Sequence, residues 1–427
     1  MKKNESINNY LVLSVILIQI VIMNYIFYTK DIVIHPYTIN QISFAKNNDF
    51  KNFFLSDDIY KINKSEINFF LENNYQKGLY YYFKKTQTPE RADAGIHGGE
   101  WGYSLVIKIF LNIFPGPDFI KIIIFHFLIH SLIYLIIVKK MKKNTSILFT
   151  LFYTLNPIVI YFIAYPNYYF LQSVAGFIVL NRYLNSNKLK YYLLDLIVLS
   201  FLFIVRSTIV GFIAAYLFII LFKYKKILFF NLCIVFVSIL LIVLSILLPS
   251  KNFKRILHTI AIGQNAYKFS SEEIYMRDDY IQDIINKKIK DEKIKSNCWK
   301  VDRCGQSDEL YLNLLGTYLL NEFNDNPNVF FVNLIKNQFL LFSPGYKSDN
   351  FLLINLSIFI GFFVLLISIF YRKFFLIFLI LISEITFSLY YPPIVAYRFG
   401  SLIILIYLGV IILEKLINKF FSNQIKI

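Results

Sequence analysis

Long apolar segments recur along the whole chain and dominate its pattern. Two examples are LVLSVILIQIVIMNYIFY and IIIFHFLIHSLIYLIIV, in which apolar residues run on almost without interruption. A helix of about 20 apolar residues crosses the hydrocarbon core of a bilayer. In lipid only helices and closed barrels satisfy every backbone polar group. Because barrel strands alternate apolar and polar positions, these continuous segments predict transmembrane helices.

The segments predict an all-α integral membrane protein with about ten transmembrane helices, forming one polytopic domain over residues 1–427. No small-residue cleavage site follows residues 10–29, so they are expected to be a span and not a signal peptide. The stretch 191–222 is too long for one span, and Arg206 divides it, which favours a hairpin that turns there. The expected spans are 10–29, 119–138, 146–164, 168–186, 191–205, 208–222, 227–248, 351–371, 374–390 and 401–418.

Two large regions, residues 30–118 and 250–350, fall outside these spans and are expected on the same side of the membrane. Each contains a shorter apolar segment with one Lys, WGYSLVIKIFLNIF in the first and FFVNLIKNQFLLFSPGY in the second. Such segments favour helices that lie in the membrane interface. The stretch SDELYLNLLGTYLLNEF in the second region also has a helical pattern.

Charge placement predicts the orientation. The apolar fraction is 57%, the mean hydropathy is +0.54 and the net charge is +17. The excess lies in the termini and the short loops of one side, whose basic residues are Lys2, Lys3, Lys139, Lys140, Lys142, Lys143, Arg182, Lys188, Lys190, Lys223, Lys225, Lys226, Arg372, Lys373, Lys415, Lys419 and Lys426. By the positive-inside rule this side is cytoplasmic. We therefore expect cytoplasmic termini, two extracytoplasmic loops, a bacterial inner (plasma) membrane location and no nucleic-acid partner.

The cysteines favour no metal site. Cys233 lies in an expected span, whereas Cys298 and Cys304 share the second loop. A disulfide survives outside the cytoplasm, so a bridged and an unbridged pair both remain open. A zinc site is not expected, because no further Cys or His lies close by in the sequence.

Two arginines stand at expected outer turns, Arg206 in VRST and Arg398 in AYRFG. Each either snorkels to the interface or forks onto a phosphate at the outer membrane surface. Glu384 lies inside an expected span, where an acid is a functional candidate or a partner for one of these arginines. His126 and His130 share a helix face and are expected to be interhelical hydrogen-bonders.

Three acids of the first loop are candidate catalytic residues. Asp31 follows the first span directly, which fixes its depth at the membrane surface. Asp93 and Glu100 lie in the glycine-rich stretch RADAGIHGGEWGY, where the backbone can approach a ligand closely. No Walker, GxGxxG, HExxH or GxSxG motif accompanies them, so these soluble-enzyme chemistries receive no support.

Several motifs follow one another in a characteristic order. An outer acid after the first span is followed by Gly-Tyr and an amphipathic segment (EWGYSLVIKIFLNIF), and then by Asn-Pro in the third span (LFYTLNPIVIYF). Arg206 in IVRSTIVGF, an acidic-aromatic helix ending in Asn-Pro (SDELYLNLLGTYLLNEFNDNP) and Arg398 in YRFGSLIILI come later. This order resembles the GT-C superfamily of membrane glycosyltransferases, which includes protein mannosyltransferases and aminoarabinose transferases.

The resemblance implies that a sugar moves from a polyprenyl-phosphate donor to a glycan, lipid or protein acceptor at the extracytoplasmic membrane face, in glycan biosynthesis for the cell envelope. Asp31, or in its place Asp93 or Glu100, would be the general base, and Arg206 and Arg398 would hold the lipid phosphate. Some relatives need a divalent metal and others do not, so that cofactor stays open and no ligand is assigned. The sugar and the acceptor also stay open.

Three alternatives remain. A lipid-linked oligosaccharide (O-antigen type) polymerase has a similar number of spans, but usually concentrates its outer mass in one late loop. A polysaccharide or lipid transporter would show repeats and broken helices at corresponding positions, and the sequence shows no repeated halves. A purely structural role would leave the two outer arginines unexplained.

Overall fold

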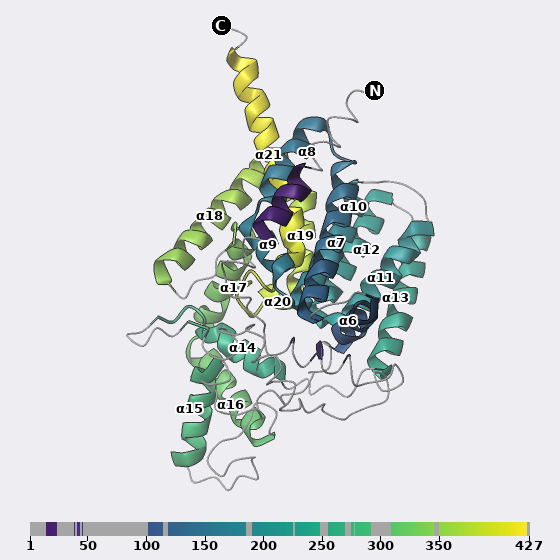
Figure 1. Ribbon diagram of the computed structural model, residues 1–427. Helices are drawn as coiled ribbons and strands as arrows, with labels where there is room; N and C mark the ends of the chain where they lie inside the picture. Colours follow the sequence, from purple (N-terminus) through teal and green to yellow (C-terminus); the bar gives the residue numbers. More distant parts are fainter. Residues whose placement is uncertain are drawn as a thin grey trace. The chain divides into compact units, whose positions relative to one another are not determined.

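The computed structural model describes residues 14–23, 38, 41–42, 45, 101–113, 118–184, 190–224, 227–247, 255–269, 275–276, 278–291, 309–345 and 350–424 (Figure 1). Throughout these residues the regular elements are helices, and they include no strand. The all-α prediction is therefore confirmed for the part of the chain that is described.

Most expected spans coincide with helices. Residues 14–23 are helical. The later elements are α6 (Trp101–Ile113), α7 (Asp118–Val138), α8 (Lys143–Phe149), η2 (Thr150–Thr154), α9 (Pro157–Ala164), η3 (Tyr168–Leu171), α10 (Gln172–Leu184), α11 (Lys190–Val205), η4 (Ser207–Ile209), α12 (Val210–Tyr224), α13 (Ile227–Leu247), α14 (Arg255–Asn265), α15 (Asp278–Asp291), α16 (Glu309–Asp325), α17 (Pro327–Leu341), α18 (Phe351–Phe370), α19 (Phe374–Ser383), α20 (Ile385–Ser388) and α21 (Phe399–Gln424).

Three of the described helices are long and apolar enough to cross a bilayer by themselves, namely Ile120–Val138, Phe351–Phe370 and Phe399–Phe420. The bent pair Lys143–Thr154 and Pro157–Ala164 passes the same test together. Six shorter apolar helices accompany them. This content is typical of an integral membrane protein, while the number of about ten spans stays a prediction.

Two expected spans are interrupted helices. The third contains the π-helix η2, and its halves meet at an angle of 56°. The bend lies where Asn156 caps α9 by accepting a hydrogen bond from the Ile158 N–H at 2.9 Å, with Pro157 at the first helical position. Proline has no N–H to continue the preceding helix, so the Asn-Pro pair ends one half and starts the other. In the ninth, Glu384 separates α19 from α20.

The chain divides into two compact units. Unit 1 comprises Met1–Pro249, Phe378–Ser383 and Phe399–Ile427, and unit 2 comprises Ser250–Ile377 and Glu384–Arg398. Each unit is described by itself below.

Close helix crossings hold unit 1 together. Figure 1 shows α7, α10, α11 and α12 side by side, and α10 packs along α21. At the α10–α21 crossing, a Cβ atom on Gly176 would lie 1.7 Å from the Gly400 carbonyl oxygen. A Cβ on Gly211 of α12 would lie 2.2 Å from the Ser383 carbonyl oxygen of α19. Small residues that let helix backbones touch are the usual packing device inside membranes.

The expected hairpin at Arg206 is confirmed as a pair of adjacent helices. The helix α11 ends at Val205, and α12 begins at Val210 after the short η4 turn. The Tyr216 hydroxyl of α12 donates to the Asp195 carboxylate of α11 at 2.7 Å. That carboxylate also accepts from Nε of Arg182, at the end of α10, at 2.8 Å. The Asp195 carboxylate inside the hairpin is thus paired within the protein.

Basic helix ends gather at one end of unit 1. Lys140, which follows α7, donates to the Asn181 side chain near the end of α10, and Lys223 near the end of α12 donates to the Tyr183 carbonyl. Thr145 of α8 donates to Glu414 of α21 at 2.6 Å. These contacts define the basic end of unit 1, which corresponds to the side predicted to be cytoplasmic.

In unit 2, α14, α15 and α16 share a core with the segment after α19 (Figure 1). Ile281, Ile285 and Ile289 form the buried face of α15 against Tyr311 and Leu315 of α16. The helix α17 packs on α18, where a Cβ on Gly361 would lie 1.9 Å from the Phe339 carbonyl oxygen. The helices predicted at the two shorter apolar segments are present as α6 and α17.

The α10–α21 crossing gives a first testable prediction. In Gly176→Ala the added methyl collides with the Gly400 backbone, so we expect the free energy of unfolding to fall by about 1–3 kcal/mol. Gly409→Ala on α21 is the matched control, because nothing lies within 4 Å of its Cβ position, and it should gain up to about 1 kcal/mol from helix propensity. Thermal unfolding in detergent measures both, and equal midpoints for the two variants would contradict the packing.

Candidate functional site

The predicted site residues fall into three groups. Asp31, Asp93 and Glu100 lie outside the described residues, as do Cys298 and Cys304. Arg206 belongs to unit 1, and Arg398 belongs to unit 2. The two arginines are therefore treated separately.

Arg206 is held by an aromatic pair. Its guanidinium carbon lies 4.5 Å from the ring centroid of Tyr169 and 5.4 Å from that of Tyr168. Its Nε donates to the Thr208 hydroxyl at 3.0 Å. The side chain is buried, so stacking on tyrosine replaces part of the lost hydration of the cation. The stacking thereby holds the guanidinium in a defined plane, whereas a snorkelling side chain would extend to the membrane interface.

Local capping places this aromatic pair. Asn167 starts η3 by accepting a hydrogen bond from the Tyr169 N–H at 3.1 Å. Arg206 itself stands in extended conformation between α11 and η4. The break in the hairpin therefore points the guanidinium at the start of η3, at the end of unit 1 opposite its basic end.

Two residues of the first loop, one near each of its ends, are anchored at this end of unit 1. The Thr38 hydroxyl donates to the Pro166 carbonyl at 2.5 Å, one residue before Asn167. Near the other end of the loop, a Cβ on Gly102 would lie 2.7 Å from the Ile204 carbonyl carbon, two residues before Arg206. In sequence, Thr38 follows Asp31 by seven residues, and Gly102 follows Glu100 by two. Thr38 and Gly102 thus pack beside the Arg206 turn.

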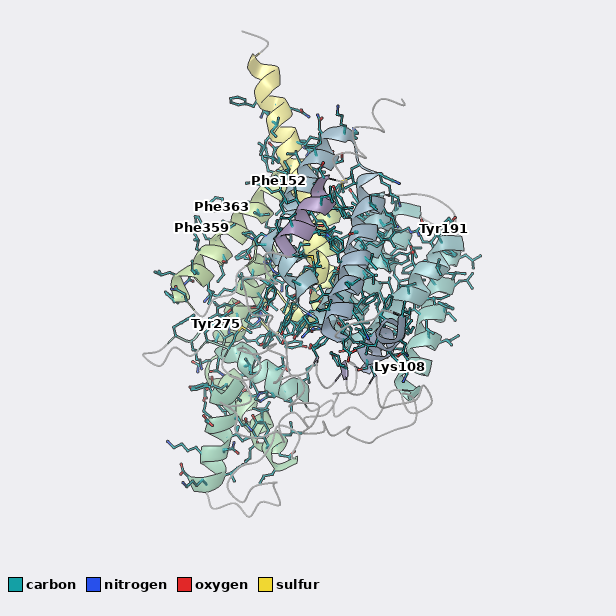
Figure 2. The ribbon with its side chains drawn as sticks, in the orientation of Figure 1. Lys108, Phe152, Tyr191, Tyr275, Phe359 and Phe363 are labelled. Carbon is teal, nitrogen blue, oxygen red and sulfur yellow. The ribbon has the colours of Figure 1, made fainter. Side chains whose placement is uncertain are left out.

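A second anchor fixes α6. Lys108 of α6, marked in Figure 2, donates to the Ala45 carbonyl at 3.0 Å. The Tyr103 hydroxyl lies 3.0 Å from Nε2 of His126 on α7, and the His126 ring stacks on Phe170 at 4.1 Å. Burial raises the pKa of the Tyr103 hydroxyl well above its usual value, because a phenolate would lose its hydration there. Tyr103 therefore stays protonated and serves as a neutral hydrogen-bonding group.

The two histidines have the predicted role. His126 contacts α6 as described above, and His130 lies 3.1 Å from the Gln19 amide of the first helix. Gln19 also donates to the Thr154 carbonyl at 2.8 Å. Both histidines are buried and join different helices, which confirms them as interhelical hydrogen-bonders.

Arg398 has a different environment within unit 2. Its Nη1 donates to the carbonyl oxygens of Leu340 at 2.7 Å, Leu341 at 3.2 Å and Ser343 at 2.8 Å. The side chain is only 2% exposed. The last carbonyls of a helix lack intrahelical partners, and a cation there also interacts favourably with the helix dipole. Arg398 thus caps the C-terminal end of α17, and its phosphate-binding role stays a prediction.

Glu384 also has a clear local position. It stands in the chain between α19 and α20 and is buried, and its carbonyl accepts from the N–H groups of Phe387 and Ser388 at 3.0 and 2.9 Å.

Within the described residues, no group of three His, Cys, Asp or Glu side chains is arranged to hold a metal ion.

Comparison with protein-family models, curated proteins and solved structures finds no match to this chain.

The part that sequence reasoning missed is the aromatic support of Arg206. Tyr168 and Tyr169 lie in the turn YPNYY, which attracts notice in the sequence only for lacking Lys and Arg. Adjacent tyrosines in a short turn opposite an arginine turn are the signal that could have pointed to a stacked guanidinium. Chemically, the arrangement offers a desolvated cation with directional N–H donors, which suits an anionic oxygen.

The cap on α17 predicts a stability effect. Arg398→Met removes a charged donor from three buried carbonyls, so we expect the free energy of unfolding to fall by about 1–3 kcal/mol. Arg398→Lys should lie between wild type and Arg398→Met, because an ammonium can still reach some of these acceptors.

Arg372 supplies the control, since it is exposed in the turn after α18. Arg372→Met should change the free energy of unfolding by no more than about 0.5 kcal/mol. Thermal unfolding in one detergent compares the three variants. A melting temperature for Arg398→Met equal to that of Arg372→Met would show that the cap contributes nothing.

Proposed function

We propose that the protein is a glycosyltransferase that moves a sugar from a polyprenyl-phosphate donor to an acceptor at the extracytoplasmic membrane face, as its resemblance to the GT-C superfamily implies. One observation carries the proposal. Thr38 and Gly102, which belong to the acid-bearing first loop (residues 30–118), both pack at the Arg206 end of unit 1. An acid from that loop and a guanidinium could therefore act on one substrate.

The orientation of unit 1 supports this assignment. The basic helix ends lie at one end and Arg206 lies at the other. Under the positive-inside rule the basic end faces the cytoplasm, which puts Arg206 on the extracytoplasmic side. A polyprenyl phosphate presents its phosphate at the membrane surface, at the depth where a helix hairpin such as α11–α12 turns.

The reaction needs a base and an anion-binding group. A first-loop carboxylate, Asp31, Asp93 or Glu100, takes the proton from the acceptor hydroxyl. The acceptor oxygen then forms a bond to the anomeric carbon, and the bond from that carbon to the phosphate oxygen breaks. The leaving polyprenyl phosphate keeps the electron pair, and the Arg206 guanidinium stabilises the negative charge that grows on it.

The stacking of Arg206 is consistent with this role. Contact with the Tyr169 ring occupies a face of the guanidinium, while N–H groups point along its plane. Because the stacking fixes the plane of the guanidinium, its charge is preorganised and costs little reorganisation at the moment of reaction. The same desolvated setting strengthens the charge interaction.

The activity test uses purified protein in lipid vesicles with radiolabelled polyprenyl-phosphate hexoses and pentoses. We expect Arg206→Lys to lower sugar transfer by about 100-fold, because it keeps the charge and loses the fork. Arg372→Lys, the same exchange at an exposed turn, should leave transfer unchanged. One of Asp31→Asn, Asp93→Asn and Glu100→Gln should abolish transfer while expression is maintained. Full activity in Arg206→Lys and in all three acid variants would overturn the site.

A transporter is the second candidate, favoured by one observation. Two expected spans are interrupted, at Asn156 and at Glu384, and discontinuous helices mark the substrate sites of many transporters. Transport would move an unmodified lipid-linked sugar across vesicles without consuming it. Sealed vesicles that carry labelled donor distinguish the two, because the transferase releases polyprenyl phosphate and the transporter leaves the donor intact.

A further inference from the structure

The helix α17 is inside out relative to a helix at a water-exposed surface. Asn333 and Asn337, one turn apart, are 7% and 1% exposed. Phe331 and Ile335, also one turn apart on another face, are 54% and 52% exposed. A surface helix in water turns its apolar stripe inward and its polar face outward. Here the amides point into the protein and the apolar side chains point out.

The inward polar groups are paired within unit 2. Nδ2 of Asn333 donates to the Gln264 carbonyl of α14 at 3.1 Å. The Tyr267 hydroxyl donates to Oδ1 of Asn337 at 2.6 Å. Lys336, the one charged residue of α17, has its Nζ 4.9 Å from the Tyr267 ring centroid. Polar side chains that join helices in this way are typical of helices in an apolar medium.

The neighbouring helix α18 likewise turns small and polar residues inward and apolar residues outward. Ser357 and Gly361 are buried against the protein, and Gly361 lets α18 approach the Phe339 backbone of α17. Phe359 and Phe363 of α18, marked in Figure 2, are 58% and 43% exposed. Since α18 is long and apolar enough to span a bilayer, its outer face is expected to contact lipid. The exposed residues of α17 belong to a helix packed directly on it.

The two ends of α17 differ: the N-terminal end carries a proline, and the C-terminal end is capped by a buried cation. Pro327 stands at the first helical position, where it removes one N–H that would otherwise lack a partner. At the other end, Arg398 donates to the terminal carbonyls. A helix end in water needs no such buried cation, because water satisfies its carbonyls, whereas one in lipid must be satisfied internally.

We propose that α17 is a half-helix embedded in one leaflet of the membrane, with acyl chains covering Phe331, Val332 and Ile335. Its 15 residues extend about 22 Å, more than the roughly 15 Å of hydrocarbon in one leaflet, so α17 would lie tilted within that leaflet. This differs from the helix in the plane of the interface expected from the sequence, which would turn a polar face to water. It is independent of the proposed catalytic role.

Site-directed spin labelling tests the embedding. Single cysteines replace Val332, Ile335, the α18 residue Phe359 and the exposed α15 residue Lys287, in a background with Cys233, Cys298 and Cys304 changed to Ser. Each labelled full-length protein is reconstituted in phosphatidylethanolamine–phosphatidylglycerol vesicles, and collision rates are measured with oxygen, which partitions into lipid, and with a water-soluble nickel chelate. Size-exclusion chromatography checks that every variant stays folded.

The expected result is a ratio of oxygen to nickel accessibility at 332 and 335 that equals the ratio at 359 and exceeds the ratio at 287. A ratio equal to that at 287 would place α17 in water and overturn the proposal. A ratio between those at 287 and 359 would place it in the interface and also overturn the embedding. Low accessibility to both reagents would mean that another protein surface covers the face, which contradicts a lipid occupant.

Discussion

Polar groups that leave water must find their partners inside the protein, and the described structure depends on this constraint. The Arg182–Asp195–Tyr216 contacts satisfy it inside the α11–α12 hairpin. Arg398 satisfies it at the end of α17. Desolvating an ion is costly unless it is paired or hydrogen-bonded, so each buried guanidinium comes with a dedicated set of partners. Those partners act together with the close backbone contacts at Gly176, Gly211 and Gly361.

The same constraint separates the two arginines that look alike in the sequence. Nη1 of Arg398 donates to three carbonyls of its own unit, an arrangement that caps a helix. Arg206 stacks on Tyr169 and donates to Thr208, an arrangement that orients a cation. Two residues near the ends of the first loop pack beside Arg206. The proposed phosphate-binding role therefore rests on Arg206 and does not require Arg398.

The helices could be predicted because their signal is local and follows from the hydrocarbon thickness. The turn at Arg206 and the hydrogen bonding of His126 and His130 also follow from spacing along one helix or hairpin. The cap on α17 could not, because Arg398 and Leu340 are 58 positions apart and only tertiary packing joins them. The reversed polarity of α17 was hidden for a similar reason, since Asn333 has its partners on α14. Asp31, Asp93 and Glu100 fall outside the described residues, so their roles stay predictions.

The central claim is that Arg206 binds the phosphate of a lipid-linked sugar at the end of unit 1 opposite the basic helix ends. The most direct measurement is an electron cryo-microscopy structure of the protein in a nanodisc containing polyprenyl phosphate. The account predicts phosphate density within about 3 Å of the Arg206 guanidinium nitrogens, on the side where Thr38 and Gly102 pack. Phosphate density bound only among the basic helix ends, with none at Arg206, would contradict it.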